Sequence, residues 1–350
     1  AYGPAMAELP PLTRRRLLRL GASTGLGLAA LQLSGCTPTG PRLLASRGDL
    51  PSAWSSLLPR VWRVELLDDP AAVLARLHSR ANDARSAAPR PALVQLGDGW
   101  AASLPPADLQ AIGTTALQAR LDPRSQPVAR LFQPPGAPLL AFPWSLNPWV
   151  LVLRNRPDLA RRRDEGWDLL LDPSLRERLV LPSSPRVSLA LMAEDPERLR
   201  RLRQQALAYD DRDALSLLLA GDAEAAVLPR QRVVPLLRRD PRLAVVLPTQ
   251  GGPLSWNLLL QPAGAVAAPL EWLGDALDPP LLITLLAGGW APPLPRDLLE
   301  SAAQRLSAPL RPLMVPPAAV QARWQDLPPL SPAERERLQT LWDGAAPPKS

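Results

Sequence analysis

The spacing of hydrophobic and polar positions alternates along the chain between the period of a strand and that of a helix. Residues 92–96 form a short apolar run that is typical of a buried strand, and residues 62–67 alternate like a half-exposed strand. Between them, Asp68-Asp69-Pro70 opens a helical pattern, because aspartate caps a helix and proline fits its first turn. Alternating strands and helices predict an α/β fold with a parallel sheet covered by helices.

The middle of the chain carries extended runs at residues 139–142, 150–153 and 254–260. Shorter strands are predicted at residues 179–181, 225–228 and 243–247. No internal repeat is visible, and 350 residues suffice for two domains.

The first 36 residues have a different pattern. Arg14, Arg15 and Arg16 precede an apolar run at residues 20–33, which ends close to Cys36. The run has about 14 residues, fewer than the ~20 that span a bilayer, and a basic region followed by a short apolar one is typical of an export signal. We therefore predict that residues 1–35 are an export signal peptide.

Two motifs refine this signal. Arg14 and Arg15 resemble the twin-arginine export motif, with export by the general route as the alternative. Leu33-Ser34-Gly35-Cys36 resembles a lipobox, in which the cysteine is lipidated and becomes the mature N-terminus. We predict a lipid anchor at Cys36 and a start residue at Met6.

Composition excludes several kinds of chemistry. Cys36 is the only cysteine and His78 the only histidine, which excludes a disulfide within the chain and argues against a zinc site. No nucleophile–base pair is evident, so neither catalysis nor a cofactor or metal is expected. The formal net charge is +7, but no basic block interleaved with aromatic residues follows the export signal, so nucleic-acid binding is not expected.

Polar turns follow several of the predicted strands. In open α/β sheets, ligands bind beyond the carboxyl ends of the strands. The turns are Ser46 to Asp49, Asp98 to Trp100, Ser183 to Arg186, and Arg230 with Gln231.

Five segments, taken in order, resemble family 1 extracellular solute-binding proteins of ABC importers, and most closely their spermidine/putrescine-binding branch. The segments are LGDGW at 96–100, AFPWS at 141–145, GWDLL at 166–170 with LPSS at 181–184, PTQGGPLSW at 248–256, and GGWAPP at 288–293. The resemblance covers residues 42–345.

This resemblance implies a two-lobed periplasmic-binding-protein-like fold of type II, with a ligand cleft between lobes that are joined by crossing strands. It implies a periplasmic, lipid-anchored monomer that captures a small-molecule solute and delivers it to ABC permease and ATPase subunits in the membrane. We expect the export signal at 1–35, a tether at 36–42, the first lobe at 43–145 plus 258–300, and the second lobe at 146–257 plus 301–350.

A polyamine needs carboxylates for its ammonium groups and aromatic faces for its methylene stem. Trp62, Trp167, Trp272 and Trp290 are assigned to core packing, whereas Trp256 is predicted to line the cleft. The full set of predicted ligand-binding residues is Ser46, Arg47, Asp49, Asp98, Trp100, Trp144, Ser183, Ser184, Arg186, Arg230, Gln231, Trp256 and Asn257.

The sequence departs from the polyamine-binding pattern in places, which keeps other ligands open. Ser183, Ser184 and Arg186 stand where that branch has acidic residues, and Asn257 stands where an aspartate is expected. Arginines at 47, 186 and 230 suit an anionic or zwitterionic solute, because a guanidinium pairs with carboxylates and phosphates. Ferric iron is disfavoured, since iron binders of this family use paired tyrosines. A non-transport envelope lipoprotein and an envelope enzyme are the alternatives outside transport.

Overall fold

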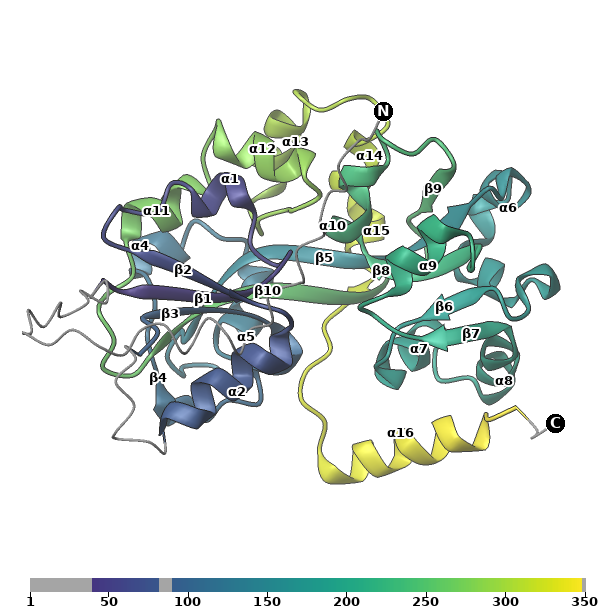
Figure 1. The fold of residues 1–350 in the computed structure, drawn as a ribbon, viewed down its shortest axis with the longest axis horizontal. Coiled ribbons are helices and arrows are strands. Elements are labelled where there is room, and N and C mark those ends of the chain that lie inside the picture. The colour runs from purple at the N-terminus through teal and green to yellow at the C-terminus, as the bar shows by residue number, and fades with distance from the viewer. Residues whose placement is uncertain (1–39, 82–89, 348–350) are drawn as a thin grey trace, which may run out of the picture. The chain divides into compact units, whose positions relative to one another are not determined.

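The computed structural model describes residues 40–81 and 90–347 (Figure 1). The predicted export signal and Cys36 lie outside these residues. Within them, no helix is both long enough and apolar enough to cross a membrane.

The first lobe begins with parallel strands, as the alternating pattern predicts. β1 pairs with β2 on one side and with β3 on the other. Their bounds, with those of the short strand and helices that follow, are β1 Arg42–Ser46, α1 Ser52–Ser55, β2 Arg63–Leu67, α2 Pro70–Ala81, β3 Leu93–Gly97, α3 Asp98–Ala101, β4 Leu109–Gln110, α4 Thr115–Gln118 and α5 Gln126–Ala129.

Two long strands connect the lobes. The first part of β5 (Ala141–Arg154) pairs antiparallel with β10 (Gly252–Pro262), and β10 pairs with β3 on its other side. The remainder of β5 pairs with β8 (Ala225–Pro229) and β9 (Leu243–Val246). Hydrogen-bonded strands therefore run in the order β2-β1-β3-β10-β5-β8-β6-β7 from one lobe to the other.

The second lobe continues from β5 with a parallel pair next to β8. Its further elements are α6 Pro157–Arg161, η3 Arg163–Leu171, β6 Leu179–Leu181, α7 Pro185–Leu191, α8 Pro196–Gln205, β7 Ala206–Tyr209, α9 Ala214–Ala220 and α10 Arg230–Val233. The chain after β10 forms α11 Leu270–Asp275, α12 Leu281–Ala287, α13 Arg296–Ala303, α14 Arg311–Met314, α15 Ala318–Gln321, β11 Trp324–Gln325 and α16 Pro332–Gly344. The remaining short 3-10 helices are η1 Pro106–Asp108, η2 Pro123–Ser125, η4 Pro173–Leu175 and η5 Val234–Leu236.

A tryptophan cluster lies in the core of the first lobe. Trp54 of α1 stacks on Trp272 of α11 with ring centroids 4.3 Å apart. Each indole N–H donates to the backbone carbonyl of the other residue, at 2.9 and 2.8 Å. Trp144 extends the cluster, with its ring centroid 5.0 Å from that of Trp54. The ring centroid of Trp290 lies 5.0 Å from that of Trp144. Four large rings and two buried, satisfied N–H groups thereby join α1, β5 and α11.

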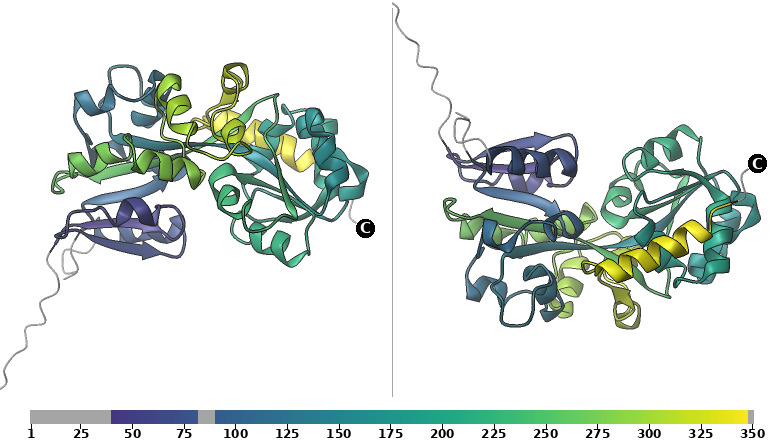
Figure 2. Two further views of the ribbon diagram at one scale, coloured as in Figure 1. Left: turned by 90° about the horizontal axis from the view of Figure 1, so that it is seen from above. Right: turned by 90° about the horizontal axis from the view of Figure 1, so that it is seen from below.

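The C-terminal part of the chain is divided between the two cores (Figure 2). Ala302, Leu306 and Met314 pack in the core of the first lobe. Leu338 and Trp342 of α16 pack in the core of the second. The sequence prediction assigned residues 301–350 to the second lobe; the structure differs at 302–314, because the apolar face of α13 is buried beside α12.

Trp54→Phe is expected to lower the free energy of unfolding by about 1–3 kcal/mol, because it leaves the buried carbonyl of Trp272 without its donor. Urea unfolding would measure this loss. The control is Trp100→Phe, since Trp100 is 42% exposed. Equal losses in the two variants would show that the reciprocal hydrogen bonds contribute no specific stability.

Candidate functional site

Polar residues from four neighbouring strands line up at one end of the first-lobe sheet. β1 ends at Ser46 and β3 ends at Gly97, which leads directly into Asp98. On β10, Asn257 is the register partner of Gly97, and Ser145 of β5 is the partner of Asn257. This is the carboxyl end of the parallel strands, where ligand sites of α/β proteins are found.

Asp98 is the most perturbed acid in this row. Its side chain lies at the start of α3, and the residue is only 8% exposed. One carboxylate oxygen accepts a hydrogen bond from the backbone N–H of Trp256 at 3.2 Å. Burial raises the pKa of Asp98 to about 6, hydrogen bonds from backbone N–H groups oppose this rise, and the negative charge of Asp326 adds to it.

Trp256 joins two carboxylates. Its backbone N–H reaches Asp98, and its indole N–H donates to Oδ1 of Asp326 at 2.8 Å. The ring itself is fully buried with Leu254 and Leu258, so it does not present a face to a ligand. The prediction that Trp256 lines the site therefore changes: its N–H groups orient the acids, while its ring belongs to the core.

Asp326 was missed by the sequence prediction. It follows β11, which pairs with the first residues of β10, and this pairing brings Asp326 to Trp256. Nothing in the local sequence QDLPP distinguishes this aspartate from a surface turn residue.

One arginine of the second lobe interacts electrostatically with Asp98. Arg186, in the first turn of α7, donates from Nη1 to the carbonyl of Leu327 at 3.1 Å. Partial burial lowers its pKa, while the negative charges of Asp98 and Glu334 favour its protonated form. The Arg186 guanidinium therefore lies within electrostatic reach of Asp98, and its hydrogen bond to Leu327 attaches it to the residue that follows Asp326 in the sequence.

A second polar group lies beyond β1. The Ser46 hydroxyl donates to Asp49, and the charge of Arg232 from the second lobe also favours the ionised carboxylate. Burial is the stronger effect and raises the pKa of Asp49. Arg232 in turn donates to the backbone carbonyls of Asp211 and Arg212.

Five of the other predicted residues divide into three groups. Ser183 and Ser184 are exposed at the start of α7, and Ser183 donates to Asp211. Asn257 accepts a hydrogen bond from Gln95 at 3.0 Å, and both side chains are buried, as is Gln231. Arg47 is exposed and pairs with Asp68 at 3.3 Å.

Trp144 and Arg230 do not lie at the site surface. Trp144 has no exposed area, because it packs between Trp54 and Trp290 in the core. Arg230 is also fully buried, and its guanidinium donates only to backbone carbonyls. The structure therefore places these two side chains in the interior, as it does the ring of Trp256.

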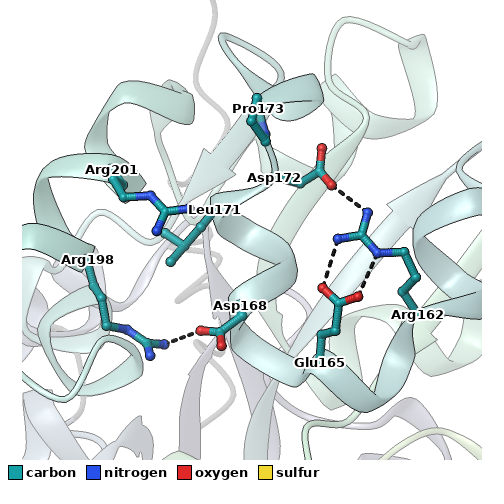
Figure 3. Close-up of a pocket in the computed structure, with 8 residues that line it drawn as sticks. All are labelled: Arg162, Glu165, Asp168, Leu171, Asp172, Pro173, Arg198 and Arg201. Carbon is teal, nitrogen blue, oxygen red and sulfur yellow. Dashed lines mark hydrogen bonds and ion pairs between the residues drawn. The ribbon is translucent and has the colours of Figure 1, made fainter.

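The second lobe also carries a surface hollow of about 310 Å³ (Figure 3). Arg162 pairs with Glu165 at 2.7 Å and with Asp172 at 2.6 Å, and Arg198 pairs with Asp168 at 2.5 Å. Every carboxylate lining the hollow already has an arginine partner, so this charge-neutral hollow is a weaker candidate than the row at the strand ends. No group of three potential metal ligands occurs in residues 40–81 and 90–347.

The comparisons with known proteins concern the fold. No family model matches the sequence, and no curated protein matches it either. Solved structures do match. The chain has the two-lobed periplasmic-binding-protein fold. The spermidine/putrescine ABC transporter substrate-binding protein PotD of Streptococcus pneumoniae superposes with a TM-score of 0.66 at 12% identity, covering 87% of this chain and 98% of that one.

Two further structures agree. The TpPotD lipoprotein of Treponema pallidum has a TM-score of 0.61 at 13% identity, covering 87% of this chain and 99% of that one. The substrate-binding protein of an ABC transporter from Agrobacterium tumefaciens has a TM-score of 0.58 at 13% identity, covering 87% and 95%. At these identities the likeness shows the fold alone.

Asp98→Asn is expected to stabilise the protein at neutral pH but not in acid. Because the folded pKa is about 6 and the ordinary value is 3.8, the folded state holds a proton that the unfolded state releases, so this group's contribution to stability falls as pH rises between these values. The variant should gain about 2–3 kcal/mol at about pH 7 and little at about pH 4.

Urea unfolding across this pH range measures the effect, with Asp108→Asn as the control because Asp108 is exposed in the same lobe. A gain that does not change with pH would contradict the raised pKa.

Proposed function

We propose that this chain is the substrate-binding component of an ABC importer and that it captures a small cationic solute, best matched by a polyamine such as spermidine or putrescine. The observation that carries the proposal is the pair of carboxylates, Asp98 and Asp326, held by the two N–H groups of Trp256. The solute would be enclosed by closure of the two lobes and released to a membrane permease.

The charge balance at the site favours a cation. Asp98 and Asp49 both have raised pKa values because burial removes water from their carboxylates. An ammonium group supplies the compensation that water no longer provides, and it does so best when the carboxylates are ionised.

Two of the three arginines that suggested an anionic solute, Arg47, Arg186 and Arg230, have other partners in the structure. Arg230 is enclosed in the interior, and Arg47 is paired with Asp68. Of the three, only Arg186 faces Asp98. The fold likeness to two proteins described as PotD or TpPotD supports the same choice.

Arg186 favours one second candidate, a zwitterionic solute. An ammonium beside Asp98 and Asp326 and a carboxylate on the Arg186 guanidinium would satisfy both charges in one ligand. The two candidates differ in what Arg186 does: it binds a zwitterion, whereas it repels a polyamine.

Calorimetric titration with spermidine, putrescine, neutral amino acids and phosphate tests the proposal. Spermidine should bind, and Asp326→Asn should weaken binding about tenfold or more, because a hydrogen bond to a charged group contributes roughly 1.5–3 kcal/mol. Affinity should rise with pH through about 6, as Asp98 ionises.

Asp108→Asn is the matched control, because Asp108 is an exposed aspartate of the same lobe. Binding of amino acids but not polyamines, lost in Arg186→Gln, would favour the zwitterion. If no solute in the panel binds or raises the melting temperature, the importer function fails and an envelope role without transport takes its place.

We further propose that the mature protein is a periplasmic monomer anchored by lipid at Cys36. Cys36→Ser should release it from the membrane, because a multiply acylated cysteine is the only anchor that the sequence indicates. Cell fractionation and incorporation of labelled fatty acid measure this. Label retained in Cys36→Ser would contradict the anchor.

A further inference from the structure

A third connection between the lobes runs through residues 313–327, which we call the C-terminal crossing. It leaves the core of the first lobe at Met314, passes through α15 and β11, and leads to α16 on the second lobe. It carries Asp326 to Trp256.

Arginine side chains hold the backbone of this crossing. The hydrogen bonds are Arg230 to the carbonyls of Leu313 at 2.7 Å and Met314 at 3.4 Å, Arg296 to Pro316 at 2.8 Å, Arg124 to Gln321 at 2.7 Å and to Trp324, and Arg186 to Leu327 at 3.1 Å. Arg124 and Arg296 belong to the first lobe, while Arg186 and Arg230 belong to α7 and α10 of the second. The crossing is therefore tied to both lobes.

The turn before β10 shows how closely the crossing is packed. Gly251 has a φ of +80°, and a Cβ on it would lie 2.3 Å from the backbone oxygen of Arg323. Only glycine allows this approach, which places β11 beside β10.

Arg230 differs from the other three arginines in its burial. It is 0% exposed, and a second nitrogen, Nη2, donates to the carbonyl of Leu146 on β5 at 3.2 Å. One guanidinium thus joins α10, the long strand β5 and the start of the C-terminal crossing. Its Nε has no hydrogen-bond partner in the described part of the chain.

A buried guanidinium bound only by carbonyl dipoles is costly, and the burial lowers the pKa of Arg230 to about 9. A methionine would avoid the cost of burying a charge, but it is shorter than arginine and would leave the carbonyls of Leu313 and Leu146 without this donor. What the guanidinium adds is geometry, because its planar fork of donors reaches acceptors on two segments at once.

We propose that Arg230 is a positioning residue that fixes the angle between the lobes. Rotation of the second lobe about β5 and β10 moves α10 relative to Leu313 and Leu146, and this breaks the bonds that Arg230 makes. The lobe angle is therefore restricted to arrangements that keep these bonds. This proposal depends on the proposed function in one respect only: the lobe angle matters for solute capture if the protein binds a solute between its lobes.

Distance measurements between spin labels test this without any solute. Labels at Val266→Cys on the first lobe and Leu207→Cys on the second, in a full chain with Cys36→Ser, use two side chains that are 60% and 42% exposed. Arg230→Met should broaden the distance distribution about twofold relative to the parent chain, because the lobe angle is no longer restrained.

Arg130→Met is the matched control, since Arg130 donates to the carbonyl of Ala137 at 3.2 Å within a single lobe. It should leave the distribution unchanged. Arg124→Met, at a less buried tie to the same crossing, should broaden it as well, and it decides the matter if Arg230→Met does not fold.

A distribution as narrow as the parent's in folded Arg230→Met, or in Arg124→Met where Arg230→Met does not fold, would overturn the proposal. Equal broadening in Arg130→Met would do the same. Failure of the proposed solute would appear in the titration alone, so the two failures are distinguishable.

Discussion

The antiparallel pairing of β5 with β10 is the constraint on which the rest of the structure depends. Both strands belong to the first-lobe sheet, and β5 continues without a break into the second. Because β10 also pairs with β3, the end of β3 and its Asp98 are placed against Trp256. The pairing of β11 with the start of β10 brings Asp326 to the same tryptophan. The strand β10 thus takes part in both the connection between lobes and the position of the two acids.

Charge at the site follows from what each lobe contributes. The first lobe supplies Asp49 and Asp98 from the ends of parallel strands, and the C-terminal crossing adds Asp326. The second lobe supplies Arg186 and Arg232. Since nearly all cationic side chains in this chain are arginines, many of them serve as multiple donors to backbone carbonyls rather than as counter-ions. This use of arginine is consistent with a pair of acids at the candidate site of a chain of net positive charge.

The sequence and the structure differ most where residues distant along the chain meet. Arg230 looked like a site residue because it follows a strand, as Asp98 does. Its carbonyl partner at Leu313 is 83 residues away, and nothing near Arg230 indicates that this segment covers it. Asp326 lies 70 residues from Trp256, and its own neighbours resemble those of a surface turn. Trp144 and Trp256 were also predicted to bind the ligand, because a tryptophan suits a ligand site as well as a core. Their burial depends on segments that are distant along the chain.

The sequence by itself determined the α/β class, most of the longer strands and helices, the long crossing runs and the polar turns at the strand ends, but not the strand β7. These follow from periodicity and turn chemistry, which are local properties of the chain. Only the tertiary structure decided that Asp326 joins Asp98, that Arg230 is enclosed, and that residues 302–314 pack with the first lobe. The burial of a side chain and its hydrogen-bond partners depend on which distant segments of the chain pack against it. The local sequence pattern does not identify those segments.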